Sequence, residues 1–227
     1  MLKNNITEQS QQIGLQHPER LSQLAQLAIV GQVILLASAW LLPFVSEYRL
    51  VGDNISELVL GRYGFVQTLA FIISGVGTLG LAYAIRQLTE GAWGSLVGSL
   101  LVAIYGVGAI LVAIFPTDRI DTVDLSAQST TGTIHSLVSL ISFLSVIAGM
   151  IILAWTFGRA GRWRSLLPWA AIFATAAVSL IMAQITAQQG PWAGLMQRAL
   201  VTVIAGWIIL VAIRIRSMLT AGEVGDR

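Results

Sequence analysis

Charged residues are scarce in this chain. Of its 227 residues, 11% are Asp, Glu, Lys or Arg and 56% are hydrophobic. A soluble domain carries about 25% charged residues, so this chain has too few to cover a water-exposed surface. The shortage excludes a soluble globular enzyme, a disordered chain and a fibrous protein. The long apolar runs exclude an outer-membrane barrel, whose strands alternate over short segments. The composition therefore predicts an all-α, polytopic transmembrane bundle.

Cysteine is absent and histidine is rare. The lack of cysteine excludes disulfides, iron–sulfur ligation, c-type haem attachment and thiol catalysis. Of the two histidines, His17 precedes the first apolar run, so the chain alone cannot supply two facing haem ligands. A pigment held by one ligand or by none stays open. No cofactor and no metal are predicted, because the acids Asp118, Asp121 and Asp124 lack the pattern of a calcium-binding loop.

Six apolar runs are each about long enough to cross the hydrocarbon core, which takes about 20 residues. They are Leu24–Phe44, Phe65–Ile85, Ser95–Phe115, His135–Phe157, Leu166–Ile185 and Ala199–Ile213. The last run is short, and we expect its helix to begin nearer Leu195. Pro18 is expected to open the first helix, because proline is well tolerated in a first turn. The polar stretch before it does not resemble a removable signal peptide.

The distribution of basic residues predicts the orientation. One side of the bundle collects nine of the 13 Lys and Arg residues, and the other collects Arg49, Arg62, Arg119 and Arg198. Basic loops stay in the cytoplasm, so we expect both termini there. The chain then divides into a cytoplasmic segment over residues 1–22, a six-span domain over 23–215 and a cytoplasmic tail over 216–227. The net charge of +2 reflects this topology, and no nucleic-acid partner is expected.

The cores of the six runs contain no Asp, Glu, Lys or Arg. Ionisable groups inside the membrane usually mark proton relays and ion paths, so their absence argues against a proton-coupled transporter or pump. Gly75 and Gly106 begin two similar Gly-Val-Gly triplets, which indicate close helix packing. Serines recur every third residue in the fourth run: Ser136, Ser139, Ser142 and Ser145. They form either a small-residue packing face, or a hydroxyl-lined cavity, or a nucleophilic site.

The first extracytoplasmic loop carries a capping signal. Asn54 and Glu57 have the spacing of a capping box, and Gly61 can end the helix that follows. We expect one or two helical turns lying on the membrane surface with their apolar side down. Glu57 is then either a cap, or an acid, or a salt-bridge partner of Arg62.

The second loop joins an acid to the remaining histidine. Asp118 lies at the end of the third span, and His135 lies in the first turn of the fourth, which Thr131 or Thr133 can cap. His135 is either a neutral residue bonded to a loop carbonyl, or a general base, a metal ligand or a pH-sensing partner of Asp118.

The third loop places Arg198 at the start of the last span, as Arg62 is at the start of the second. A cation at a helix N-terminus is unfavourable by about 0.3–1 kcal/mol. We therefore expect both arginines to pair with acids on the same face, namely Glu57, Asp53 and Asp118. Tyr63 and Gln197 belong to the same candidate network.

Several segments together resemble a known family. They are Asp53–Leu58, Gly61–Thr68, Ile114–Asp118, Thr131–His135 and Gly194–Arg198. Their order and spacing against six spans are similar to the bacterial and archaeal membrane family called domain of unknown function 998, over about residues 24–215. The resemblance implies six helices and directs attention to the loop residues named above. It implies no established reaction.

Three functions fit the sequence. The first is a non-catalytic accessory, assembly or lipid- or pigment-contacting subunit, whose partners are the bilayer and other membrane-protein subunits or pigments. The second is an interfacial lipid-processing enzyme, in which Asp118 and His135 transfer protons while Arg62 and Arg198 hold the head group. The third is a channel or transporter for small neutral solutes. The location is a cell membrane, with an internal photosynthetic membrane left open.

Overall fold

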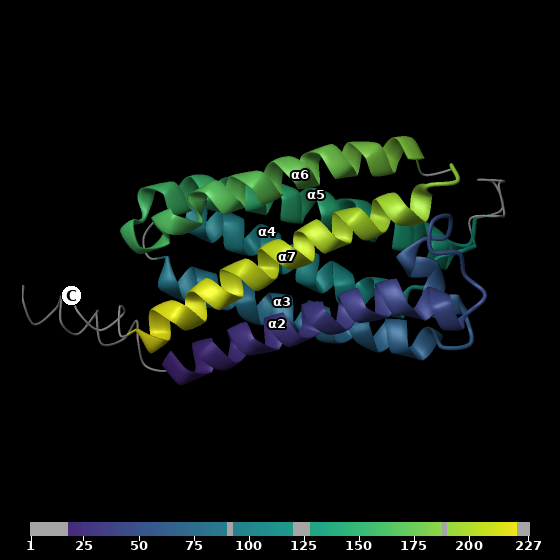
Figure 1. Cartoon of the computed structure of the whole chain (residues 1–227), viewed down its shortest axis with the longest axis horizontal. Helices are drawn as coiled ribbons and strands as arrows, with labels where there is room; N and C mark the ends of the chain where they lie inside the picture. Colours follow the sequence, from purple (N-terminus) through teal and green to yellow (C-terminus); the bar gives the residue numbers. More distant parts are fainter. Residues whose placement is uncertain (1–17, 90–92, 120–127, 188–189, 222–227) are drawn as a thin grey trace, which may run out of the picture.

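The computed structural model describes residues 18–89, 93–119, 128–187 and 190–221. Six long helices dominate it, and none of these residues forms a strand (Figure 1). The helices are α2 (Pro18–Leu41), α3 (Gly64–Leu88), α4 (Trp93–Ile114), α5 (Thr130–Arg159), α6 (Leu167–Ala187) and α7 (Ala193–Thr220). Each is long and apolar enough to cross a membrane. The predicted all-α, six-span bundle is thus confirmed.

Within the described ranges the chain also forms three short 3-10 helices: η1 (Leu42–Val45), η2 (Ile55–Leu60) and η4 (Gly161–Leu166). The helix that opens at Pro18 matches the prediction. The last span begins at Ala193, close to the start expected near Leu195, but α7 runs on to Thr220, past the end of the apolar run at Ile213. An α-helix satisfies its backbone internally and can continue into the interface, so apolar length underestimates helix length.

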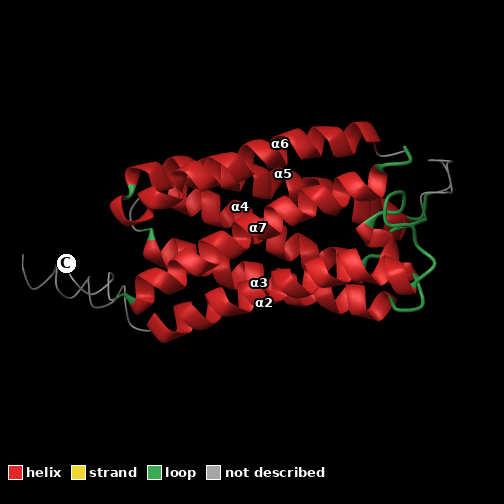
Figure 2. Ribbon diagram, in the orientation of Figure 1, coloured by secondary structure: helices red, strands yellow, loops and turns green. Residues whose placement is uncertain are grey.

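All six helices run roughly along one axis, and the chain begins α2 and ends α7 at the same end (Figure 1). The opposite end carries most of the irregular segments (Figure 2). We call it the loop end, and among the described residues it comprises 42–63, 115–119, 128–129 and 190–192. The placement of the α2 start and the α7 end in the cytoplasm stays a prediction.

Glycines bring α2, α3 and α4 into close contact. A Cβ on Gly75 of α3 would lie 2.6 Å from the carbonyl oxygen of Gly106 in α4. On the other side of α3, a Cβ on Gly77 would lie 2.8 Å from the carbonyl oxygen of Leu27 in α2. Helices in a membrane associate through such small residues, since lipid supplies no hydrophobic drive between them. The predicted packing role of the glycine triplets is confirmed at this crossing.

One buried polar group ties α2 to α3 in mid-bundle. The amide nitrogen of Gln32, which is fully buried, donates to the hydroxyl of Ser74 at 2.8 Å and to that of Thr78 at 3.1 Å. Hydrogen bonds between membrane helices contribute about 0.6 kcal/mol each on average. The interaction therefore fixes the register of the two helices more than it stabilises them.

Candidate functional site

The loop between α2 and α3 is held first by an internal ion pair. The carboxylate of Asp53 accepts hydrogen bonds from the backbone N–H of Arg49 at 2.7 Å and from its guanidinium at 2.7 and 3.1 Å. Partial burial raises the pKa of Asp53, but the bonds and the charge of Arg49 outweigh it, so the net pKa lies below the usual value. The side chain of Asp53 is 16% exposed and that of Arg49 is 80% exposed. The pair is therefore weak but sensitive to acid.

Acid should weaken this loop in a defined direction. Because the pKa of Asp53 is lower in the folded than in the unfolded chain, its stabilisation is complete above the unfolded value of about 3.9. It is lost as the pH falls through the lower folded pKa. We expect Asp53→Asn to flatten the acid limb of unfolding free energy against pH, measured by detergent-micelle unfolding. Arg49→Gln should do the same. An acid limb unchanged in both variants would contradict the assignment.

Glu57 caps the short helix η2. Its Oε1 accepts the backbone N–H of Asn54 at 2.9 Å, and its side chain is 5% exposed. Gly61 follows the helix, as the sequence predicts, and its N–H donates to the carbonyl of Leu58. Ile55 and Leu58 are buried beneath. The capping role of Glu57 and the short helix with a buried apolar side are confirmed, whereas its place on the membrane surface stays a prediction.

The start of α7 binds the same loop through its backbone. The N–H of Leu195 donates to the carbonyl of Val51 at 2.9 Å. The side-chain oxygen of Gln197 accepts the N–H of Ile55 at 2.6 Å. These bonds hold both ends of the segment Val51–Ile55 against α7.

Arg198 lies at the centre of this contact and is fully buried. Its Nε donates to the carbonyl of Ala39 at 2.9 Å, and its Nη1 donates to the carbonyls of Asp53 at 2.7 Å and Gly194 at 3.1 Å. The guanidinium thus joins α2, the loop and α7. We call Gly194, Leu195, Gln197 and Arg198 the loop clamp.

The prediction that Arg198 pairs with a carboxylate is wrong, and proline explains its actual partner. In an α-helix the carbonyl of Ala39 would accept the N–H of residue 43. Residue 43 is Pro43, which has no N–H. The orphaned carbonyl at the end of α2 needs another donor, and the Nε of Arg198 supplies it. Asp53 contributes its backbone carbonyl to Arg198 and its carboxylate to Arg49.

Arg62 is outside the clamp. It is exposed, and its guanidinium lies 5.5 Å from the ring centre of Tyr63, which is half-buried. It forms no ion pair with any acid in the part of the chain that the structure describes. The predicted pairing of Arg62 with Glu57, Asp53 or Asp118 is therefore wrong. An exposed ion pair contributes so little that water can replace it.

Asp118 caps the start of α5. Its two carboxylate oxygens accept the N–H of Ser129 at 2.8 Å and the hydroxyl of Ser129 at 2.7 Å. That hydroxyl in turn accepts the N–H of Gly132 at 3.0 Å. The N-cap is therefore Ser129, and the prediction of Thr131 or Thr133 is wrong. Asp118 fixes the choice, because it orients Ser129 and places a negative charge at the helix N-terminus.

Gly132 leaves the space that this cap needs, since a Cβ there would lie 2.0 Å from a carboxylate oxygen of Asp118. The neighbouring acids Asp121 and Asp124 lie outside the described residues. Within the described ranges, no three His, Cys, Asp or Glu side chains lie close enough together to hold a metal ion.

His135 completes the connection from α4 to α5. Its side chain is buried, and its Nδ1 lies 2.8 Å from the carbonyl oxygen of Phe115. A carbonyl only accepts, so Nδ1 must carry the hydrogen, and in the neutral ring Nε2 is then an acceptor. The alternative of a loop-carbonyl partner is confirmed. Both oxygens of Asp118 bind Ser129 instead of His135.

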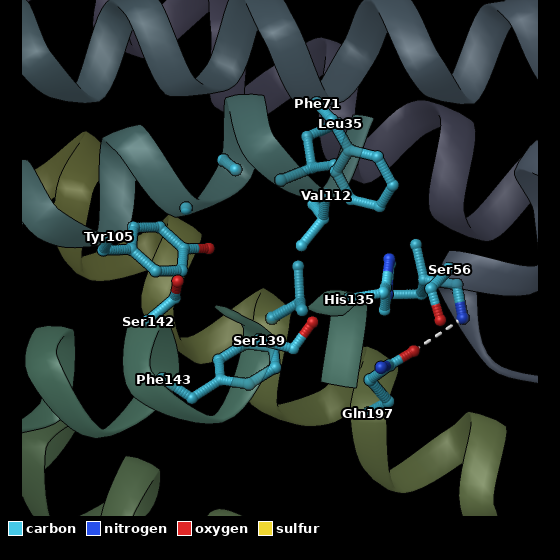
Figure 3. Close-up of a pocket in the computed structure, with 14 residues that line it drawn as sticks. Leu35, Ser56, Phe71, Tyr105, Val112, His135, Ser139, Ser142, Phe143 and Gln197 are labelled. Carbon is cyan, nitrogen blue, oxygen red and sulfur yellow. Dashed lines mark hydrogen bonds between the residues drawn. The ribbon is translucent and has the colours of Figure 1, made fainter. Parts of the chain in front are cut away.

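A cavity of about 50 Å³ lies between the α2–α3 loop and the connection from α4 to α5 (Figure 3). It is lined by Leu35, Ile55, Ser56, Phe71, Tyr105, Gly108, Ala109, Val112, His135, Ser139, Ser142, Phe143, Gln197 and Val201. Its polar groups are hydroxyls, one imidazole and one amide. Of the serine stripe, Ser139 and Ser142 line it, as the hydroxyl-lined alternative requires. Ser56 belongs to the segment Asp53–Leu58, to which the family resemblance directs attention, whereas sequence reasoning missed Tyr105, because it does not stand out from its neighbours in the chain.

No curated protein and no solved structure shows significant similarity to the chain. A family model does match it, under the description "Protein of unknown function (DUF998)", over residues 29–214. The match covers all six spans in whole or in part. The motifs at which the structure finds the capped loops and the clamp all lie within it. The chain is therefore a multi-pass, membrane-type helical protein that belongs to the DUF998 family.

Proposed function

We propose that the protein is a non-catalytic membrane subunit that acts by contact with lipids or with other membrane proteins. One observation supports this most directly: the polar groups that the sequence offers for chemistry are bonded to the backbone or to a cap. Asp118 holds Ser129, His135 holds the carbonyl of Phe115, and Arg198 holds three carbonyls. Of the two arginines that the head-group hypothesis needs, Arg198 is fully buried, and only Arg62 is exposed.

The test asks whether the activity of each variant in cells follows the amount of folded protein, as for a structural subunit, or is lost at normal abundance, as for an enzyme. In cells where deletion of the gene changes the membrane lipid or protein composition, we expect Asp118→Asn and His135→Ala to restore the wild-type state in proportion to the amount of folded protein. Native mass spectrometry of the extracted protein should then find lipids or other polypeptides in fixed stoichiometry. A variant that is present at wild-type level but behaves as the deletion would refute the proposal.

The second candidate is the lipid-processing enzyme, and one feature favours it. His135 lines the cavity together with Ser139 and Ser142, so a histidine and two hydroxyls face one space. The same variants distinguish the two functions, because a proton-transfer role makes His135→Ala inactive at normal abundance. Arg62 is exposed and could still meet a head group from outside.

A further inference from the structure

We propose that the cavity at the loop end binds the head of a neutral, single-chain lipid whose polar group is a hydroxyl or carbonyl oxygen. The proposal rests on the function proposed above, in that the lipid is held and not converted. Three features of the cavity carry it: apolar walls, polar groups with defined free positions, and a rim that adjoins the lipid-facing side of α5.

The walls suit a hydrocarbon chain. Leu35, Phe71, Val112, Phe143 and Val201 come from five different elements of the bundle and give the cavity an apolar surface on several sides. Binding sites for small molecules are usually apolar with a few placed polar groups. A volume of about 50 Å³ accommodates a head and the first part of a chain but not a whole lipid.

The polar groups that line the cavity already use part of their hydrogen-bonding capacity within the protein. The donors and acceptors that are left determine which ligand can bind. The oxygen of Gln197 already accepts one hydrogen bond, from the N–H of Ile55, and its amide hydrogens remain to donate. The Nδ1 of His135 donates to the carbonyl of Phe115, and the carbonyl of Val112 is a second backbone acceptor beside the ring. The hydroxyl of Ser142 donates to the carbonyl of Val138 at 2.6 Å, which leaves its oxygen as an acceptor. A ligand oxygen can therefore accept from the amide of Gln197, and a ligand hydroxyl can donate to the oxygen of Ser142.

The lining also excludes a charged head. None of the lining residues is Asp, Glu, Lys or Arg. A carboxylate or phosphate in such an apolar space would lose its hydration without gaining a counter-charge. A hydroxyl or carbonyl oxygen loses less and is compensated by one or two hydrogen bonds.

The chain of the ligand can leave toward the bilayer along α5. Ser139 and Phe143 line the cavity and are half-buried. The residues directly after them, Leu140 and Leu144, are 44% and 49% exposed on the outside of the bundle. The rim of the cavity on α5 therefore adjoins the surface that contacts lipid.

Photolabelling of the full-length protein in phosphatidylcholine nanodiscs tests the site. The probe is a long-chain alcohol carrying a diazirine, and the competitors are hexadecanol, hexadecane and palmitate. We expect hexadecanol to compete about tenfold better than the other two, the effect of one or two hydrogen bonds, and the label to map to residues that line the cavity. Equal competition by all three, or a label spread evenly over the lipid-facing helices, would overturn the proposal.

Two variants and a control localise the binding. Ser139→Leu fills the cavity and should reduce specific labelling about tenfold, whereas Ser136→Leu, on the exposed face of the same helix, should leave it unchanged. If Ser139→Leu does not fold, Tyr105→Phe removes only a hydroxyl and should reduce labelling about threefold. Unchanged labelling in a folded cavity variant refutes the lipid site. That result would not refute the proposed non-catalytic function, which is tested separately by whether variants that are present at the wild-type level behave like the deletion in cells.

Discussion

Arg198→Met should destabilise the protein by about 3–5 kcal/mol, one of the two largest losses we expect from a single substitution. The change removes a donor from two buried carbonyls and one partly buried carbonyl, and a buried acceptor left without a partner costs about 1–3 kcal/mol. Part of that loss is offset, since a buried guanidinium no longer has to be desolvated. The carbonyl of Ala39 is affected most, because Pro43 gives it no alternative. The free energy of unfolding in mixed micelles, followed by circular dichroism, measures the loss.

Two further substitutions serve as controls for Arg198. Arg62→Met removes an exposed arginine at the same end of the bundle and should change stability by no more than about 0.5 kcal/mol. Arg198→Lys keeps the charge but replaces the planar fork with a single nitrogen, so it should fall between the wild type and Arg198→Met. Equal losses for Arg198→Met and Arg62→Met would show that charge alone, and not the bonds to the carbonyls, stabilises the loop end.

Gly194→Ala should cost about 3 kcal/mol, although it adds only one methyl group. The added Cβ would lie 2.2 Å from the carbonyl oxygen of Asp53 and 2.8 Å from the Nη1 of Arg198. The first contact is with backbone that hydrogen bonds hold in place, so the loop must move away from α7. We expect the thermal midpoint to fall and protease cleavage within the loop before α3 to increase.

Gly161→Ala is the matched control for this substitution. Gly161, like Gly194, lies in the first turn of a helix, but nothing lies within 4 Å of an added Cβ there. Its stability should stay within about 0.5 kcal/mol of the wild type. Because Gly194 and Arg198 contact the same carbonyl, the double variant Gly194→Ala, Arg198→Met should lose less than the sum of the two. Additive losses would mean that the two residues act independently.

The fold follows from the sequence because a membrane span is a local property. An apolar run of about 20 residues satisfies its own backbone and needs no distant partner to be recognised. The capping box of Glu57 is local in the same way, since its partner is three residues away. The packing role of Gly75 and Gly106 could also be predicted from the sequence, because glycine within a membrane span usually marks close helix packing.

The hydrogen-bond partners of the site residues could not be predicted from the sequence, because they depend on contacts between distant parts of the chain. Arg198 meets a carbonyl 159 residues away, and that carbonyl is open because α2 ends just before Pro43. Four hydroxyl residues stand near the start of α5, namely Ser129, Thr130, Thr131 and Thr133, and the position of Asp118 selects Ser129 as the cap. Charge complementarity predicted acids as partners of the arginines, but it ignores backbone carbonyls that lack a donor, and Arg198 binds these instead.

The loop clamp has a consequence for biogenesis. Its residues, Gly194 to Arg198, belong to the last of the six spans to leave the ribosome, whereas the loop that they bind lies between the first two. The loop can form its own cap and its ion pair with Arg49 early, but the carbonyls of Ala39 and Asp53 stay without their donor until α7 enters the membrane. Insertion of the final helix is therefore the event that closes the loop end. A chain halted before that point would expose polar backbone that cellular quality control can recognise.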